Sequence, residues 1–117
     1  MNAFFRFAIF VFFFLSASAL SGHPADSLQM KMDSTGTILS VIVFHPVKNP
    51  ANHFIVTIEV KVNGIQTVLQ TYHGQYDKAV QEAVYKLISL KPLDKVEVTA
   101  VCSIAGKAKA VYSVPEP

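Results

Sequence analysis

The chain has 117 residues and a formal net charge of +2. Its length allows one small domain, and so weak a positive charge gives no reason to expect nucleic acid or an anionic membrane surface as a partner. The single cysteine excludes an internal disulfide, although exported domains of this size often depend on such bonds.

The first 19 residues have the layout of a secretory signal peptide. One positive charge, Arg6, precedes the apolar run 7–15, and small residues follow at Ala17-Ser18-Ala19. The run is too short for a comfortable membrane span, and an uncleaved N-terminal anchor is the main alternative. We therefore expect an exported, periplasmic protein without a membrane attachment after cleavage. Its domain comprises residues 20–117, with a net charge of +1 because only Arg6 is lost.

Most of the remaining chain alternates between apolar and polar residues and is rich in Val, Ile, Thr and Tyr, which is typical of β-strands. A short strand is expected at 28–32. Residues 37–44 are apolar on both faces and predict a central strand. Residues 53–63 alternate most cleanly, and one face of this strand is expected to carry Phe54, Val56, Ile58, Val60 and Val62.

The second half of the chain continues the same pattern. Asn63-Gly64 is a strong two-residue hairpin signal and leads into a strand at 65–72. Residues 79–90 are ambiguous, because they could begin as a helix but end like a strand. Further strands are expected at 95–102 and 107–114. Seven short strands at this spacing predict an all-β fold, a seven-stranded antiparallel immunoglobulin-like β-sandwich.

Two histidines and the cysteine are the candidate functional residues. His45 ends one expected strand, His53 begins the next, and Cys102 ends a later strand. Imidazoles and a thiolate are ligands for first-row transition metals, and a rigid sheet can hold two strand-end ligands on one ion. Cys102 could instead be a buried structural thiol or an intermolecular partner. On position alone, His23 is expected to be an N-terminal residue without a role and His73 a surface residue.

The chain carries two motifs, HPVKNPANHFIVTIEVKVNG from His45 and VEVTAVCSIAGKAKA around Cys102, that resemble the iron-binding domain of desulfoferrodoxin and neelaredoxin, the superoxide reductases. The resemblance covers about residues 28–114. It implies an immunoglobulin-like sandwich with mononuclear non-haem iron, bound by four equatorial histidines and one axial cysteine. His45 and His53 match the loop histidines, Cys102 the axial thiolate and His23 the upstream histidine. Superoxide is the implied substrate, and an external electron donor is the implied partner.

The chain departs from the family pattern in three places. Ala105 stands where the family has an equatorial histidine, the loop between His45 and His53 is longer, and the lysine before the first histidine is absent. Lys48, inside the loop, could replace that lysine only by coincidence. The resemblance thus implies at most a His3Cys site, which could hold iron or favour copper or zinc. A non-enzymatic copper or zinc carrier and a metal-free immunoglobulin-like binding module are the alternatives.

Overall fold

The computed structural model describes residues 27–117, and this part of the chain consists of seven β-strands without a helix. The expected leader, 1–19, and His23 lie outside the described residues. The described part accordingly holds no helix long and apolar enough to span a membrane. The strands are β1 (Ser27–Met32), β2 (Ile38–Phe44), β3 (Ile55–Val62), β4 (Ile65–Thr71), β5 (Val80–Lys86), β6 (Lys95–Cys102) and β7 (Lys107–Ser113).

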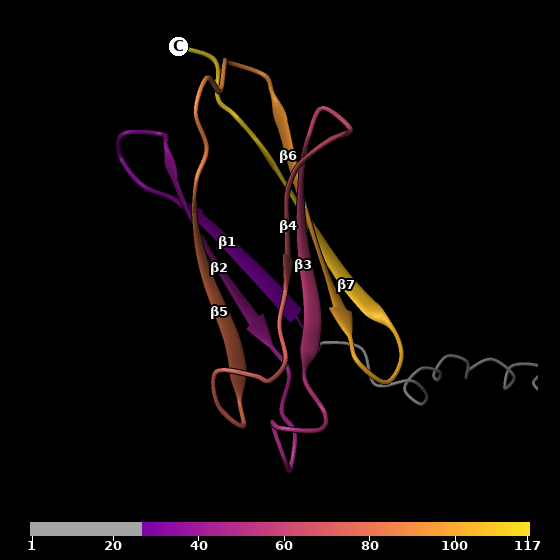
Figure 1. Cartoon of the computed structure of the whole chain (residues 1–117). Coiled ribbons are helices and arrows are strands. Elements are labelled where there is room, and N and C mark those ends of the chain that lie inside the picture. The colour runs from indigo at the N-terminus through magenta and orange to yellow at the C-terminus, as the bar shows by residue number, and fades with distance from the viewer. Residues whose placement is uncertain (1–26) are drawn as a thin grey trace, which may run out of the picture.

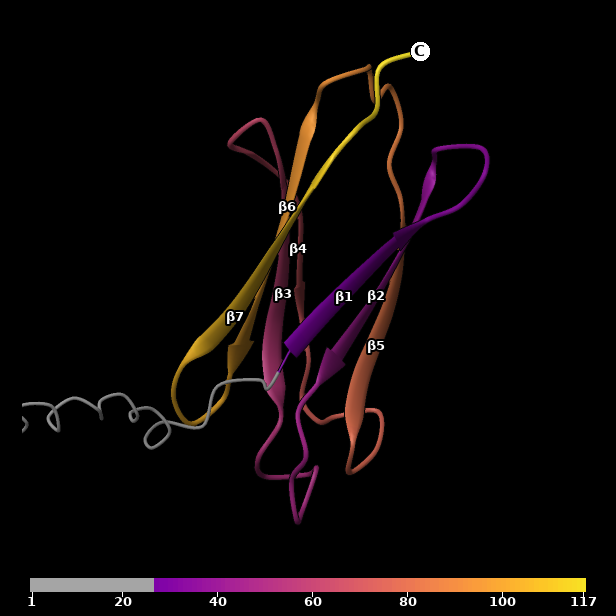
Figure 2. The same cartoon turned by 180° about the vertical axis from the view of Figure 1, so that it is seen from behind.

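The strands form two antiparallel sheets that pack face to face as a sandwich (Figure 1). One sheet has the order β1-β2-β5 and the other β4-β3-β6-β7. The view from behind shows β1 and β7 on the same side of the molecule (Figure 2). The predicted seven-stranded antiparallel β-sandwich is therefore confirmed, and its immunoglobulin-like designation stays a prediction.

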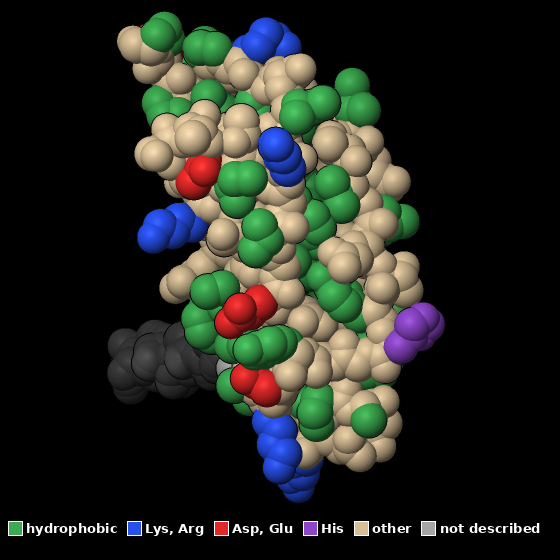
Figure 3. All heavy atoms as spheres, turned by 60° about the vertical axis from the view of Figure 1, so that its left-hand side comes forward, with side chains coloured by type: hydrophobic (Ala, Val, Ile, Leu, Met, Phe, Trp, Pro, Cys, Tyr) green, Lys and Arg blue, Asp and Glu red, His purple; other side chains and the backbone are tan. Residues whose placement is uncertain are grey.

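The core lies between the sheets and is built from the inward-facing residues of the alternating strands. In β2, Leu39, Val41 and Val43 are fully buried, and the strand lies between β1 and β5, as expected for a central strand. The opposite sheet contributes mainly from β3 and β6, because these are its two central strands and their inward-facing side chains are covered by neighbouring strands. On the outside, hydrophobic, basic and acidic side chains are interspersed over the face in Figure 3.

The ambiguous segment 79–90 contains β5, an edge strand rather than a helix. Its burial alternates with a period of two: Gln81, Ala83 and Tyr85 face the core, and Glu82 and Val84 face out. Pairing with β2 places this alternation over the core, and tertiary packing therefore overrides the helical character of the first few residues.

The predicted face of β3 is wrong at its start. The pairing with β6 shifts register between Ile55 and Thr57, which indicates a β-bulge. A bulge adds one residue to a strand and so inverts the alternation on one side of it. Ile55 is therefore fully buried, while Phe54 and Val56, which we expected on the same face as Ile58, are only partly buried. The same shift pairs Ile55 with Cys102, which brings the start of β3 beside the end of β6.

The hairpin predicted from Asn63-Gly64 is present between β3 and β4. Both residues have positive φ, 52° and 83°, as a type I′ turn requires. The Asn63 side chain also donates to Asp94 and accepts from the backbone N–H of Lys95, so that it joins this turn to the start of β6. At the opposite end, β2–β3, β4–β5 and β6–β7 are connected, and the candidate site lies there (Figure 1).

Candidate metal centre

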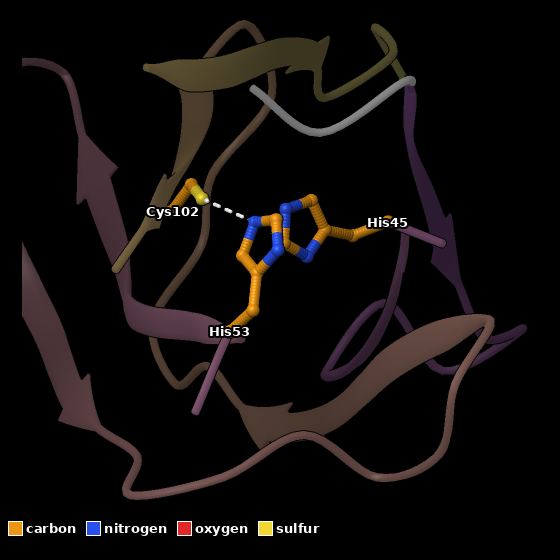
Figure 4. A group of neighbouring side chains, drawn as sticks. All are labelled: His45, His53 and Cys102. Atoms are coloured by element: carbon orange, nitrogen blue, oxygen red, sulfur yellow. Dashed lines mark hydrogen bonds between the residues drawn. The ribbon is translucent and has the colours of Figure 1, made fainter. Parts of the chain in front are cut away.

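The two sheets bring three candidate ligands to one end of the sandwich. His45 directly follows β2, His53 lies two residues before β3, and Cys102 is the last residue of β6. Because β2 and β6 belong to different sheets, His45 and Cys102 approach from opposite layers, and the connection from β2 to β3 adds His53 between them (Figure 4). The ligand atoms of the three residues all lie within 4.8 Å of one another.

One distance in the cluster fits two ligands of a shared metal ion. Cys102 Sγ and His53 Nε2 are 3.3 Å apart. Bond lengths of about 2.0 Å to nitrogen and about 2.3 Å to sulfur place such a pair about 3.5 Å apart at a tetrahedral angle and about 3.0 Å apart at a right angle. The His45 and His53 rings meet edge to face, with centroids 4.9 Å apart and planes at 85°. The most distant ligand atoms are up to 4.8 Å apart, and they would have to approach each other by about 1 Å or more to bind one ion at a tetrahedral angle.

His45 is fully buried and is held by a glutamine from another loop. Its Nδ1 lies 2.8 Å from Oε1 of Gln75. Gln75 belongs to the loop that connects β4 to β5, and it is also buried. The backbone N–H of His45 donates to the carbonyl of Ala79 at 2.9 Å. The imidazole therefore has a defined orientation, pointing from the end of β2 toward His53 and Cys102 (Figure 4).

Cys102 is buried and is fixed to the segment that carries His53. The backbone N–H of Ile104 donates to its sulfur at 3.4 Å, and such a donor would stabilise a metal-bound thiolate. The Ser103 N–H donates to the Phe54 carbonyl at 2.8 Å, and the Phe54 N–H donates to Ser103 Oγ at 3.1 Å. These reciprocal bonds connect the neighbours of Cys102 and His53, so the two ligands are positioned as a unit.

A surface hollow of about 630 Å³ opens beside the cluster. His53 forms part of its wall, whereas His45 and Cys102 lie behind it. The hollow is lined by Pro46, Val47, Lys48, Asn49, Asn52, His53 and Ile104. Lys48 is the charged residue of this lining, and a small anion could therefore approach the cluster past a cation.

The convergence predicted for His45, His53 and Cys102 is present in the structure, and metal binding by them stays a prediction. His23 lies outside the described residues, so its proposed ligand role is not tested. His73 is exposed, as expected for a surface residue. Ala105 is exposed in the turn between β6 and β7. Sequence reasoning missed Gln75, because a glutamine in a polar loop carries no sign that it is buried.

A scan against models of protein families and a search of curated proteins both find no match for the chain. The side-chain geometry is therefore what supports a function.

Proposed function

We propose that the chain binds one metal ion through His45, His53 and Cys102, and that the ion is iron, as in the superoxide reductases that it resembles. The observation that carries this proposal is the 3.3 Å approach of Cys102 Sγ to His53 Nε2, with buried His45 at the same point. Two imidazoles from the connection between β2 and β3 meet a thiol from the end of β6, and burying these polar groups together is costly unless a metal ion binds them.

His23 is the proposed fourth ligand. The first residue of β1, Ser27, pairs with Phe44, the residue just before His45. His23 precedes Ser27 by four residues, and an extended chain of that length spans about 14 Å. A link of this length is long enough to reach the cluster from Ser27, which supports the proposal of a His3Cys ligand set. Ala105 then accounts for the absence of a further histidine.

The proposed reaction is the one-electron reduction of superoxide to hydrogen peroxide. The chemistry that bound iron supplies is one electron for each superoxide, which also takes up two protons, and an external donor replaces that electron. Lys48 attracts the superoxide anion into the hollow, and the wall formed by His53 brings it beside the cluster. Cys102 contributes an electron-rich sulfur that favours release of the product.

Anaerobic reconstitution with ferrous iron tests this proposal. After oxidation we expect a thiolate-to-iron charge-transfer band that is lost in Cys102→Ser and retained in His73→Ala, a surface control. Reduced protein should consume one superoxide per iron and form peroxide without releasing dioxygen. If the band is absent, or is unchanged in Cys102→Ser, the iron site does not exist.

A copper or zinc carrier is the second candidate. Among residues 27–117, the cluster contains two nitrogen ligands and one sulfur ligand and is joined by no fourth histidine, cysteine or acidic residue. This donor set suits copper, and zinc when water or another ligand completes the site. Elemental analysis of the native protein separates the candidates: copper or zinc in place of iron favours the carrier. If the native protein contains no metal and its melting temperature is unchanged by iron, copper or zinc, the metal-free immunoglobulin-like binding module is favoured.

We further propose that the protein is exported to the periplasm after cleavage behind Ala19. The charged start, apolar run and small residues of 1–19 support this. Sequencing the N-terminus of the purified native protein tests it, with Leu20 as the expected first residue. An intact Met1 would contradict the proposal.

A further inference from the structure

We propose that Gln75 is a positioning residue of this centre: it holds His45 in the tautomer that has the proton on Nδ1 and the lone pair on Nε2. Its effect on metal binding rests on the metal site proposed above, whereas the tautomer itself can be measured without metal.

The hydrogen bonds around Gln75 define the orientation of its amide. The backbone N–H of Ile55, which can only donate, points at Oε1 from 3.2 Å. On the other side, Nε2 donates to the carbonyl oxygens of His45 at 2.7 Å and Asp77 at 3.0 Å. If the amide were rotated by half a turn, its NH₂ group would face the Ile55 N–H and its oxygen would face the two carbonyl oxygens. Oε1 must therefore point toward the Ile55 N–H and the imidazole ring of His45.

This orientation decides which nitrogen of His45 carries the proton. Gln75 Oε1 can only accept, and it lies 2.8 Å from His45 Nδ1. Nδ1 must therefore donate, and in a neutral imidazole the lone pair is then on Nε2. Metal-ligating histidines commonly donate their second ring N–H to an acceptor that fixes both the tautomer and the ring orientation. Gln75 supplies such an acceptor here.

Gln75 also joins the loops that surround the centre. Its backbone N–H donates to the Pro50 carbonyl at 3.1 Å, and its side chain contacts residues on either side of the connection from β2 to β3, His45 and Ile55. One buried side chain thus connects the residue after β2, the first residue of β3 and the loop before β5. Its replacement should affect the site more than the loss of one hydrogen bond elsewhere.

Three variants separate positioning from simple stability. Gln75→Leu removes every side-chain hydrogen bond. Gln75→Glu keeps an acceptor for His45 and Ile55 but lacks the amide N–H groups that serve the two carbonyls. Gln81→Leu is the matched control: Gln81 is also buried and donates to the Gly74 carbonyl at 3.1 Å, but it takes no part in the hydrogen bonds of the Gln75 side chain.

Zn²⁺ affinity, measured by chelator competition, is expected to fall about 10–100-fold in Gln75→Leu and to change less than threefold in Gln75→Glu and Gln81→Leu. All three variants should be less stable than the wild type in urea. Retained affinity in Gln75→Glu despite lower stability is a result that a merely structural role does not produce. Equal affinity in the wild type and Gln75→Leu, or equal losses in all three variants, would overturn the proposal.

The tautomer is tested in the metal-free wild-type protein by ¹⁵N NMR of the histidine rings. We expect His45 to show a protonated Nδ1 and an unprotonated Nε2 at pH 8. A protonated Nε2 would overturn the inference even if the protein binds metal. A wild-type protein that has the expected tautomer but binds neither Fe²⁺ nor Zn²⁺ would contradict the proposed function and leave the positioning of His45 supported.

Discussion

Metal-linked stability provides a quantitative test of the cluster. A ligand that binds only the folded state at 100 times its dissociation constant stabilises that state by about 2.7 kcal/mol. For a domain of this size each kcal/mol raises the melting temperature by about 4–8 °C, so saturating Zn²⁺ should raise it by about 10–20 °C. This gain depends on three side chains whose ligand atoms lie within 4.8 Å of one another.

Cys102→Ser should remove most of this gain. Loss of one of the three described ligands is expected to weaken binding by at least about 100-fold, the upper range for a residue that only supports a ligand. At the same Zn²⁺ concentration the remaining stabilisation is about 0.4 kcal/mol, or about 2–3 °C. His73→Ala, at an exposed position, should keep the full gain.

Circular-dichroism melts with a reductant that does not bind metal measure these shifts. The comparison is between metal-free and Zn²⁺-loaded samples of each variant, so that the intrinsic cost of a substitution cancels. An equal rise in the wild type and Cys102→Ser would refute the assignment of the cluster, because the bound zinc would then lie elsewhere.

Three further predictions concern the fold. Gly64→Ala should lower the free energy of unfolding, measured in urea, by about 1–2 kcal/mol. The φ of this residue is +83° and an added Cβ would meet no neighbouring atom, so backbone strain is the only cost. An unchanged urea midpoint would contradict this prediction. Hydrogen bonds from the backbone N–H of Lys91 and from the Asn63 side chain lower the pKa of Asp94 below its ordinary value of 3.8. The stability that ionised Asp94 contributes is therefore present above pH 3.8 and is lost as the pH falls through the lowered pKa. Asp94→Asn should make the urea midpoint less dependent on pH in this acid range. Burial raises the pKa of Tyr85, so we expect this phenol to ionise only when the protein unfolds at alkaline pH. The part of the tyrosinate absorbance that rises together with unfolding should be missing in Tyr85→Phe. Ionisation of Tyr85 while the fold is intact would contradict this prediction.

Most of the secondary structure and the candidate ligands were accessible from the sequence. Period-two alternation indicates strands wherever one face leaves water, and Asn63-Gly64 specifies a turn because both residues tolerate positive φ. The two strand-end histidines and Cys102 were identifiable as candidate ligands from their chemistry alone. These are local properties, set by a residue and its near neighbours in the chain.

The tertiary structure decided what depends on distant partners. The bulge after Ile55 arises from pairing with β6. It turns the first residues of β3 to the side opposite to the one that local alternation predicted. The strand character of β5 comes from its pairing with β2. Gln75 acquires a role only because folding buries it between His45 and Ile55, where its donors and acceptors must be satisfied. Alternation along a chain indicates which side of a strand is buried, but the distance between candidate ligands on two sheets is set by how those sheets pack.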